Sequence, residues 1–242
     1  MMTLFLAALG VGILWALWIP QGGLVRPGYY AWMVATAFAV LTVMTGLAWT
    51  PARGLDPWLA GAAAGALTGR ILMSLGFHRI GLGLACLAGA ACLGHLLPGT
   101  GPFAVASVVL SALVLGATID AMVLGHWYLV QHGLSFQPLE RMGDALLGLY
   151  AIRTVLAAAW LWAMGGWERL TAGEVPLDRW MFLLLRGLAG LVGPLALGWM
   201  VRECVKLKSN TSATGILYVI CLFVLVGEFT AVWFWTSLGA WI

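Results

Sequence analysis

The chain has 242 residues, of which 62% are hydrophobic and only 9% are charged, and its mean hydropathy is +0.99. Soluble domains have about 45–50% apolar and about 25% charged residues, so this composition excludes a soluble globular protein and indicates lipid as the solvent. The net charge of +3 is small, and no basic stripe with base-stacking aromatic residues occurs in the sequence, which excludes nucleic acid as a partner.

The apolar runs predict an all-α fold, because a helix of about 20 apolar residues crosses the hydrocarbon of a bilayer. We expect a single integral membrane domain over residues 1–242, built as a bundle of about eight transmembrane helices. In chain order, the expected helices cover residues 3–19, 30–49, 57–76, 80–97, 103–130, 142–166, 179–202 and 213–237. Proline, glycine and charged residues separate them.

Two of these divisions leave alternatives open. No basic residue precedes the first apolar run, which favours a retained membrane helix over a secretory signal. Between the third and fourth runs the break at Gly76–Arg79 is weak, and two Ala/Gly-rich segments flank it. Those segments could be re-entrant or interfacial pieces, so the number of crossings is uncertain by about one.

The third expected helix contains a doubled G-x-x-x-G pattern at Gly61, Gly65 and Gly69. Small residues at this spacing let another helix backbone approach closely, which is a main source of helix association in lipid. We interpret the face as a packing surface within the bundle. Contact with a partner protein is the alternative.

Basic residues fall on alternate loops and predict the orientation of the chain. One set of loops carries Arg26, Arg79, Arg141, Arg202, Lys206 and Lys208. The other set carries Arg53, Arg169 and Arg179, diluted by Asp56, Glu168, Glu174 and Asp178. Because basic loops stay in the cytoplasm, the first set is expected inside and both termini outside.

Ionisable residues inside the predicted helices are expensive in lipid and are therefore candidate functional residues. At about 1.5 Å of rise per residue, Asp120 and Arg153 are expected roughly 13 Å and 16 Å from the cytoplasmic end, which suggests a pair. Arg186 and Glu228 are expected about 10 Å and 13 Å from the outer end, which suggests a second pair in the other leaflet. Such pairs could merely fix helix register, or one could line a proton or quinone path.

The segment from Gly125 to Gly133 is the most distinctive in the chain and contains His126, Tyr128 and His132. We predict that it contributes to a polar cluster in the cytoplasmic leaflet. The other members are His78, Arg70, Tyr150, Asp120 and Arg153. Histidine can donate to or accept from a quinone carbonyl, and Asp and Tyr can relay the proton. Interfacial histidines bonded to neighbouring groups are the simpler alternative.

A b-type haem is a second, less favoured cofactor. Membrane cytochromes use paired axial histidines, and His126 with His78 is the available pair near the inner face, whereas His95 is expected near the outer one. No metal site is predicted, because the histidines lack the spacing of metal ligands. The four cysteines, which lie in or beside apolar runs, are expected to be small packing residues.

In its eight helices, outside termini and polar groups within the bundle, the chain resembles the membrane anchor subunits of the polysulfide-reductase and dimethylsulfoxide-reductase type. The resemblance implies quinol binding and electron transfer to a soluble iron–sulfur partner. It lies in the architecture alone, because no family motif matches this sequence residue by residue. In those anchors the quinone pocket is often near the outer face. The resemblance therefore makes Glu228, Arg186 and His95 a second, outer-leaflet candidate site.

Together these features predict a membrane-embedded subunit of a respiratory or redox complex, located in the bacterial cytoplasmic (inner) membrane. It would handle quinone and proton transfer beside separate redox subunits, and it would be at most a non-catalytic electron-transfer subunit of an oxidoreductase. One alternative is a secondary transporter or channel with Asp120, Glu228, Arg153 and Arg186 in its path. Another is a structural or assembly factor of the membrane.

Overall fold

The computed structural model describes residues 1–20, 25, 27–50, 54–97, 99–131, 135–163 and 177–238. In these residues the named elements are all helices, which confirms the predicted all-α class. Seven are α1 (Met2–Ala16), α2 (Pro27–Ala48), α3 (Pro57–Ser74), α4 (His78–Leu96), α5 (Pro102–Val130), α6 (Gln137–Ala163) and α10 (Asn210–Leu238). Between α6 and α10 a further rod is formed by α8 (Leu177–Leu185), the π-helical segment η1 (Arg186–Val192) and α9 (Gly193–Lys206), joined end to end.

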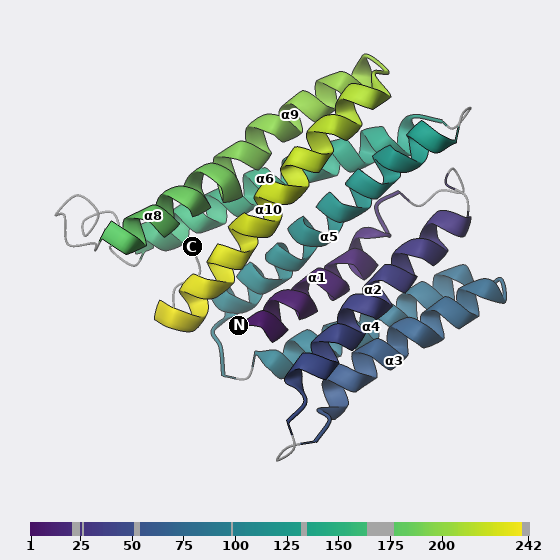
Figure 1. Ribbon diagram of the computed structural model, residues 1–242, viewed down its shortest axis with the longest axis horizontal. Coiled ribbons are helices and arrows are strands. Elements are labelled where there is room, and N and C mark those ends of the chain that lie inside the picture. Colours follow the sequence, from purple (N-terminus) through teal and green to yellow (C-terminus); the bar gives the residue numbers. More distant parts are fainter. Residues whose placement is uncertain are drawn as a thin grey trace.

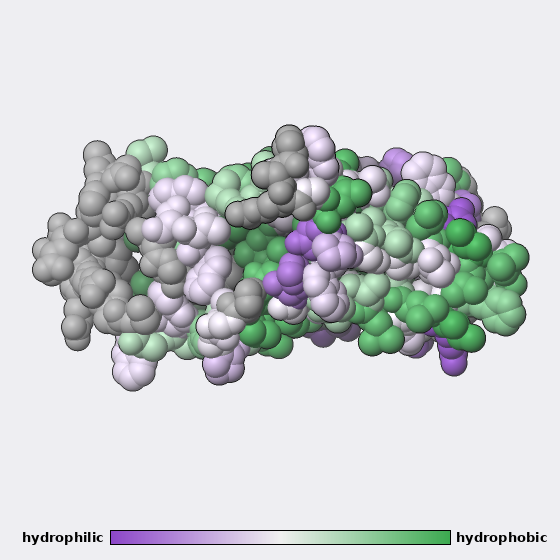
Figure 2. Space-filling view, turned by 90° about the horizontal axis from the view of Figure 1, so that it is seen from below, coloured by the Kyte–Doolittle hydropathy of each residue, from purple (hydrophilic) through white to green (hydrophobic). Residues whose placement is uncertain are grey.

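Six helices of the described part are long and apolar enough to cross a membrane. They are α2, α4, α5, α6, the rod from Trp180 to Lys206, and α10; α1 is apolar but only 15 residues long. Large apolar side chains such as Trp32, Leu87 and Val155 are more than half exposed on the outer surface. The face in Figure 2 shows the same pattern, since hydrophobic residues cover much of it and strongly hydrophilic ones are confined to small areas. The chain is an integral membrane helix bundle.

Figure 1 shows α1 and α5 in the middle of the bundle, with α2, α3 and α4 on one side and α6, α9 and α10 on the other. Successive rods run in opposite directions. We call the end where α1 begins and α10 ends the terminal end, and the end where α2, α4, α6 and α10 begin the opposite end.

The central pair is held together by glycine. A Cβ atom on Gly12 of α1 would lie 1.8 Å from the carbonyl oxygen of Ala112, and one on Gly116 of α5 would lie 1.9 Å from the carbonyl carbon of Gly12. Because no side chain larger than hydrogen fits at either position, the two backbones touch. The close approach gives van der Waals contact between the two backbones, which bulkier residues would prevent.

The predicted glycine face of α3 packs against α4, as a surface within the bundle. A Cβ on Gly65 would lie 2.4 Å from the Ala88 Cβ, and one on Gly69 would lie 2.5 Å from the Gly81 carbonyl oxygen. Gly61 does not take part, because a Cβ there would meet nothing within 4 Å. Two of the three glycines therefore form the interface that the pattern predicted.

Asp56 caps the start of α3 at the terminal end of the bundle. Its Oδ1 accepts hydrogen bonds from the backbone N–H groups of Trp58 (2.9 Å) and Leu59 (3.4 Å), and its Oδ2 lies 3.1 Å from His95 Nε2. Partial burial raises the pKa of Asp56, but the bonds from Trp58, His95 and Leu59 together lower it below its ordinary value. The cap satisfies N–H groups that have no acceptor within the helix.

The helix boundaries agree with the sequence prediction to within a few residues, except at the start of α6. We predicted a start at residue 142, but the helix begins at Gln137, whose N–H donates to Ser135 Oγ at 3.4 Å. Pro138 lies in the first turn, where its missing N–H removes no helical hydrogen bond. Of the charges used to predict orientation, Arg26, Arg53, Glu168, Arg169 and Glu174 lie outside the described residues.

Candidate functional site

The carboxylate of Glu228 lies at the centre of a buried polar cluster. It accepts hydrogen bonds from Arg153 at both oxygens (Nε to Oε1 and Nη2 to Oε2, each 3.2 Å), from Arg186 Nη1 to Oε1 (3.0 Å) and from Ser111 Oγ to Oε2 (2.5 Å). All four residues are at most 1% exposed. We call Ser111, Arg153, Arg186 and Glu228 the charge cluster; it connects α5, α6, η1 and α10.

The four members meet because they lie at the same depth. Ser111 and Arg186 each lie nine residues after the start of their rods, and Arg153 and Glu228 each lie ten residues before the end of theirs. All four of these helix ends are at the terminal end of the bundle. At 1.5 Å per residue the charge cluster is about 14–15 Å from that end, which is near the middle of a hydrocarbon layer about 30 Å thick.

The π-helical segment and two glycines place Arg186 in the cluster. Arg186 is the first residue of η1, and its Nη1 also approaches the carbonyl oxygen of Gly190 at 3.5 Å. A Cβ on Gly227 of α10 would lie 2.2 Å from the Gly190 Cα, so the backbones of η1 and α10 are in direct contact. π-Helical turns are rare and frequently occur at functional sites. Segment η1 brings the Arg186 guanidinium next to α10, because the two glycines leave free the space that side chains would otherwise fill.

The predicted pair of Arg186 with Glu228 is confirmed, whereas the predicted pair of Arg153 with Asp120 is wrong. Arg153 bonds to Glu228 instead. Because α6 begins at Gln137, Arg153 lies 16 residues from the opposite end, about 24 Å rather than the predicted 16 Å. Asp120 is nine residues further along α5 than Ser111, about 13 Å from the level of the cluster. The structure thus forms one three-charge cluster, not two pairs in separate leaflets.

Asp120 is completely buried elsewhere, at a point of α5 that contacts the start of α2. No described residue donates a hydrogen bond to either carboxylate oxygen. Its backbone carbonyl accepts a hydrogen bond from Tyr29 Oη at 2.9 Å, and the Tyr29 ring packs edge-on against Trp127 with centroids 6.3 Å apart. Tyr29 therefore contacts α5 at two places, the Asp120 backbone and the Trp127 ring.

A cavity of about 490 Å³ lies between α2 and α5 near the opposite end, and we call it the α2–α5 cavity. Its lining includes Trp32, Met33, Thr36, Val123, His126, Trp127, Val130 and Gln131. The indole N–H of Trp127 and the amide oxygen of Gln131 are buried and have no hydrogen-bond partner among the described residues. Trp32 and Val130 are each 66% exposed on the outer surface. The residues that line the cavity therefore include apolar side chains facing lipid and two residues with buried, unsatisfied polar groups.

The remaining residues of the predicted inner cluster are distributed over separate places. His126 Nδ1 lies 3.2 Å from Tyr218 Oη on α10. Tyr128 Oη donates to the carbonyl oxygen of Ser135, and Tyr150 Oη lies 2.8 Å from Thr118 Oγ1. A single cluster was expected because these residues were all predicted to lie in the cytoplasmic leaflet. They point in different directions around their helices, so the expected cluster does not form.

Arg70 and His78 line a second cavity, of about 340 Å³, between the start of α2 and the turn from α3 to α4. It uses other positions of α2 than the α2–α5 cavity does, so His78 and His126, the predicted haem ligands, belong to different cavities. Among the described residues, no group of three His, Cys, Asp or Glu residues is arranged to hold a metal ion. His132 lies outside the described residues.

The residues of the predicted outer-leaflet site also lie in two separate places. Glu228 and Arg186 are in contact, but His95 is bonded to Asp56 and stacks on Trp58 with ring centroids 5.6 Å apart. This places His95 at the capped start of α3, in the half of the bundle formed by α3 and α4.

Sequence reasoning did not name Ser111, Trp127 or Gln131 as site residues. A signal for Ser111 is present, because Ser107 and Ser111 stand one helical turn apart in the otherwise apolar first half of α5. Trp127 and Gln131 lie in the distinctive segment 125–133, but an indole near a helix end is also typical of an interfacial anchor. Comparisons of the chain with protein-family models, with curated proteins and with solved structures find no match.

Proposed function

We propose that the protein is a membrane subunit of a redox complex and that the α2–α5 cavity binds the ring of a quinone. The observation that carries this proposal is the lining of one cavity, in which His126 lies beside two residues with unsatisfied buried groups, the Trp127 N–H and the Gln131 amide oxygen. A quinone carbonyl accepts from an indole N–H, and a quinol hydroxyl donates to an amide oxygen. Both redox forms would therefore find a partner in this cavity.

The size and position of the cavity support a lipid-soluble ligand. Its volume of about 490 Å³ falls within the roughly 300–1,000 Å³ that is usual for small-molecule sites. His126 and Gln131 are at the end of α5, so the polar groups lie at the edge of the hydrocarbon. The exposed side chains of Trp32 and Val130 leave a route from the lipid, along which an isoprenoid tail would extend.

Asp120 is the proposed proton acceptor behind the cavity wall. It is six residues, about 9 Å of helix rise, from His126 on the same helix. Tyr29 packs on Trp127 of the cavity lining and its hydroxyl donates a hydrogen bond to the Asp120 backbone carbonyl, so it connects the cavity wall with the proposed acceptor. Quinol oxidation releases protons together with electrons, so a site of this kind needs a route for both. We infer that electrons pass to a separate redox subunit.

We also infer that the opposite end of the bundle faces the cytoplasm of a bacterial cell and that all eight rods cross the membrane. The described cations at this end are Arg70, Arg79, Arg141, Arg202, Lys206 and Lys208, in agreement with the rule that basic loops stay inside. Reporter fusions test this orientation. A phosphatase fused after residue 242 should be active, and a fluorescent protein that folds only in the cytoplasm should be dark at that position.

The quinone proposal is tested by extraction and titration. Protein purified in mild detergent should retain a stoichiometric quinone, measured by mass spectrometry of the organic extract. After delipidation it should bind a short-chain ubiquinone or menaquinone. Loss of one neutral hydrogen bond, about 1 kcal/mol, should weaken binding about fivefold in Trp127→Phe or Gln131→Leu. Trp199→Phe, at a lipid-exposed tryptophan of α9 outside the cavity, is the matched control. The proposal would be refuted if no quinone co-purified with the protein and the delipidated protein bound no added quinone.

The charge cluster favours a second candidate, a secondary transporter, because charged groups and a π-helical break coincide near the middle of the membrane. Discontinuous helices at this depth form the substrate sites of many transporters. Uptake or counterflow of a solute into proteoliposomes, lost in Arg186→Met, would support this candidate. Retained quinone binding without uptake would exclude it.

A further inference from the structure

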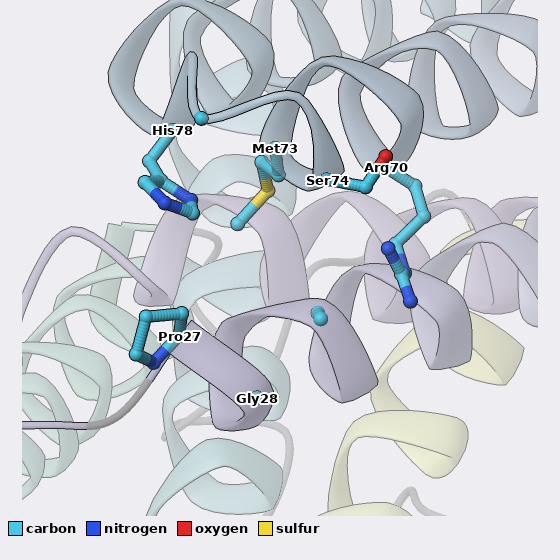
Figure 3. Close-up of a pocket in the computed structure, with 8 residues that line it drawn as sticks. Pro27, Gly28, Arg70, Met73, Ser74 and His78 are labelled. Carbon is cyan, nitrogen blue, oxygen red and sulfur yellow. The ribbon is translucent and has the colours of Figure 1, made fainter.

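The cavity between α2 and the α3–α4 turn has a chemistry unlike that of the α2–α5 cavity. Figure 3 shows its labelled lining residues, which are Pro27, Gly28, Arg70, Met73, Ser74 and His78. The Arg70 and His78 side chains both extend from the α3–α4 side towards the first turns of α2. Arg70 lies four residues before the end of α3, about 6 Å from it, so the cavity is at the level where lipid headgroups meet the hydrocarbon.

The cation in this cavity has no partner from the described protein. No described residue forms an ion pair or hydrogen bond with the Arg70 guanidinium, and none bonds to the His78 ring. The other described arginines at this end include Arg202, which is paired with Asp144 at 2.6 Å. An arginine partly withdrawn from water requires an anion, since the charge is expensive beside hydrocarbon without one. The lining of this cavity supplies no carboxylate.

The geometry also suits an oxyanion rather than a halide or a planar ring. The guanidinium offers paired N–H donors in a fork that matches two oxygens of a phosphate. His78 approaches from a different position of the same cavity. Ser74 also lines the cavity, but its hydroxyl donates to the Ile71 carbonyl oxygen (2.6 Å) and is not counted as a ligand. At the start of α2, Pro27 has no N–H, but the backbone N–H of Gly28 in the lining has no helical acceptor and is one further donor.

We infer that this cavity binds a phosphate group, with Arg70 as its main ligand and His78 as a second. The phosphate belongs either to the headgroup of an anionic phospholipid or to a soluble phosphate compound. The site is independent of the quinone proposal, because the two cavities share no lining residue. It would hold α2 against the α3–α4 hairpin through an anion that the chain itself does not provide.

Thermal unfolding in nanodiscs tests the inference. Phosphatidylglycerol added to phosphatidylcholine discs should raise the unfolding midpoint of the wild-type protein. Arg70→Gln should bind phosphatidylglycerol at least about tenfold more weakly, because it loses a charge-assisted bidentate bond, and His78→Gln should lose part of the effect. Arg79→Gln is the matched control, since Arg79 is an exposed cation next to His78 but is not part of the cavity lining. It should behave as the wild type.

A second arm of the experiment distinguishes the sources of phosphate. Inorganic phosphate and glycerol 1-phosphate are added at matched ionic strength to phosphatidylcholine discs. A rise in midpoint that depends on Arg70 identifies a soluble phosphate as ligand, and a rise only with phosphatidylglycerol identifies the lipid. Equal shifts in the wild type and Arg70→Gln would overturn the inference, as would no shift with any probe.

A measurement on the wild-type chain keeps the inference testable if Arg70→Gln does not fold. A photoactivatable phosphatidylglycerol with its reactive group at the glycerol backbone is cross-linked in the discs, and the adducts are mapped by peptide mass spectrometry. Adducts should concentrate in residues 27–31 and 70–78. Adducts confined to other helices would contradict the proposed site, whatever the behaviour of the variant.

Discussion

The guanidinium of Arg153, on α6, donates two hydrogen bonds to the carboxylate of Glu228, on α10, and both side chains are almost completely buried. Arg186 donates to the same carboxylate from η1. One carboxylate therefore connects two basic side chains from different helices near the middle of the membrane. Such an arrangement makes helix positions in the second half of the bundle dependent on each other.

Removing the central carboxylate should be strongly destabilising. In Glu228→Met the two guanidinium groups remain buried without their shared anion, and we expect a loss of about 3–5 kcal/mol in the free energy of unfolding. Replacing Arg153, Arg186 and Glu228 together with methionine should restore stability to near the wild-type value, because no uncompensated charge remains. Equilibrium unfolding in mixed detergent micelles measures both.

Glu203→Met is the control for this series, since Glu203 pairs with Lys206 on the exposed surface of α9. It should change the free energy of unfolding by less than about 1 kcal/mol. If Glu228→Met were no more destabilising than Glu203→Met, the charge cluster would contribute nothing to the fold.

The contact between Gly190 and Gly227 should be intolerant of even one added methyl group. Gly227→Ala would place a Cβ 2.2 Å from the Gly190 Cα, which forces α10 away from η1 and lengthens the bond from Arg186 to Glu228. We expect destabilisation of about 1–3 kcal/mol. Gly215→Ala, also on α10, meets nothing within 4 Å and should be neutral or stabilising, because alanine favours the helix. Similar unfolding midpoints for the two variants would contradict this prediction.

Asp120 should be dispensable for stability, in contrast to Glu228. Leucine has the same branching of heavy atoms as aspartate, and no described residue hydrogen-bonds to the Asp120 carboxylate. Asp120→Leu removes a buried polar group without a partner, so the free energy of unfolding should be unchanged or higher by about 1–3 kcal/mol. If Asp120 accepts protons from quinol, the variant should still bind quinone but lose quinol-dependent reduction of its partner subunit. A strongly destabilised Asp120→Leu would indicate a structural partner instead.

The cap at the start of α3 should be sensitive to pH only in strongly acidic solution. Asp56→Ala should lower the free energy of unfolding by about 1 kcal/mol at neutral pH, whereas Asp56→Asn should retain the cap. Hydrogen bonds from Trp58, His95 and Leu59 outweigh the effect of partial burial and lower the pKa of Asp56. Its ionised form therefore stabilises the fold above the ordinary pKa of about 3.9, and this stability is lost as the pH falls through the lowered value.

Unfolding midpoints of the wild type and Asp56→Ala between neutral and acidic pH measure this effect. The difference between them should be constant down to about pH 4 and should shrink below it. A difference that disappeared near pH 6 would assign the effect to another group.

The amino-acid sequence by itself determined the fold class, most helix positions and the glycine interface of α3. Hydrophobicity acts locally, so the cost of exposing polar groups to lipid can be read along the chain without knowledge of the partners of a helix. The pair of Arg186 and Glu228 was also predictable. The relevant ends of their helices, Leu177 and Leu238, were placed within two residues of the observed bounds.

Only the tertiary structure decided which groups meet. A shift of five residues in the start of α6 moves the expected level of Arg153 by about 7.5 Å along the helix axis, enough to exchange Asp120 for Glu228 as its partner. The arrangement of the helices separates His126 from Arg70 and His78, because the described residues of α3 and α4 do not pack on α5, and these residues line different cavities. In a membrane the lipid-facing and inward faces of a helix are both apolar, so the sequence pattern does not reveal which helices become neighbours. Close packing at a few glycines and the buried ionic contacts determine it.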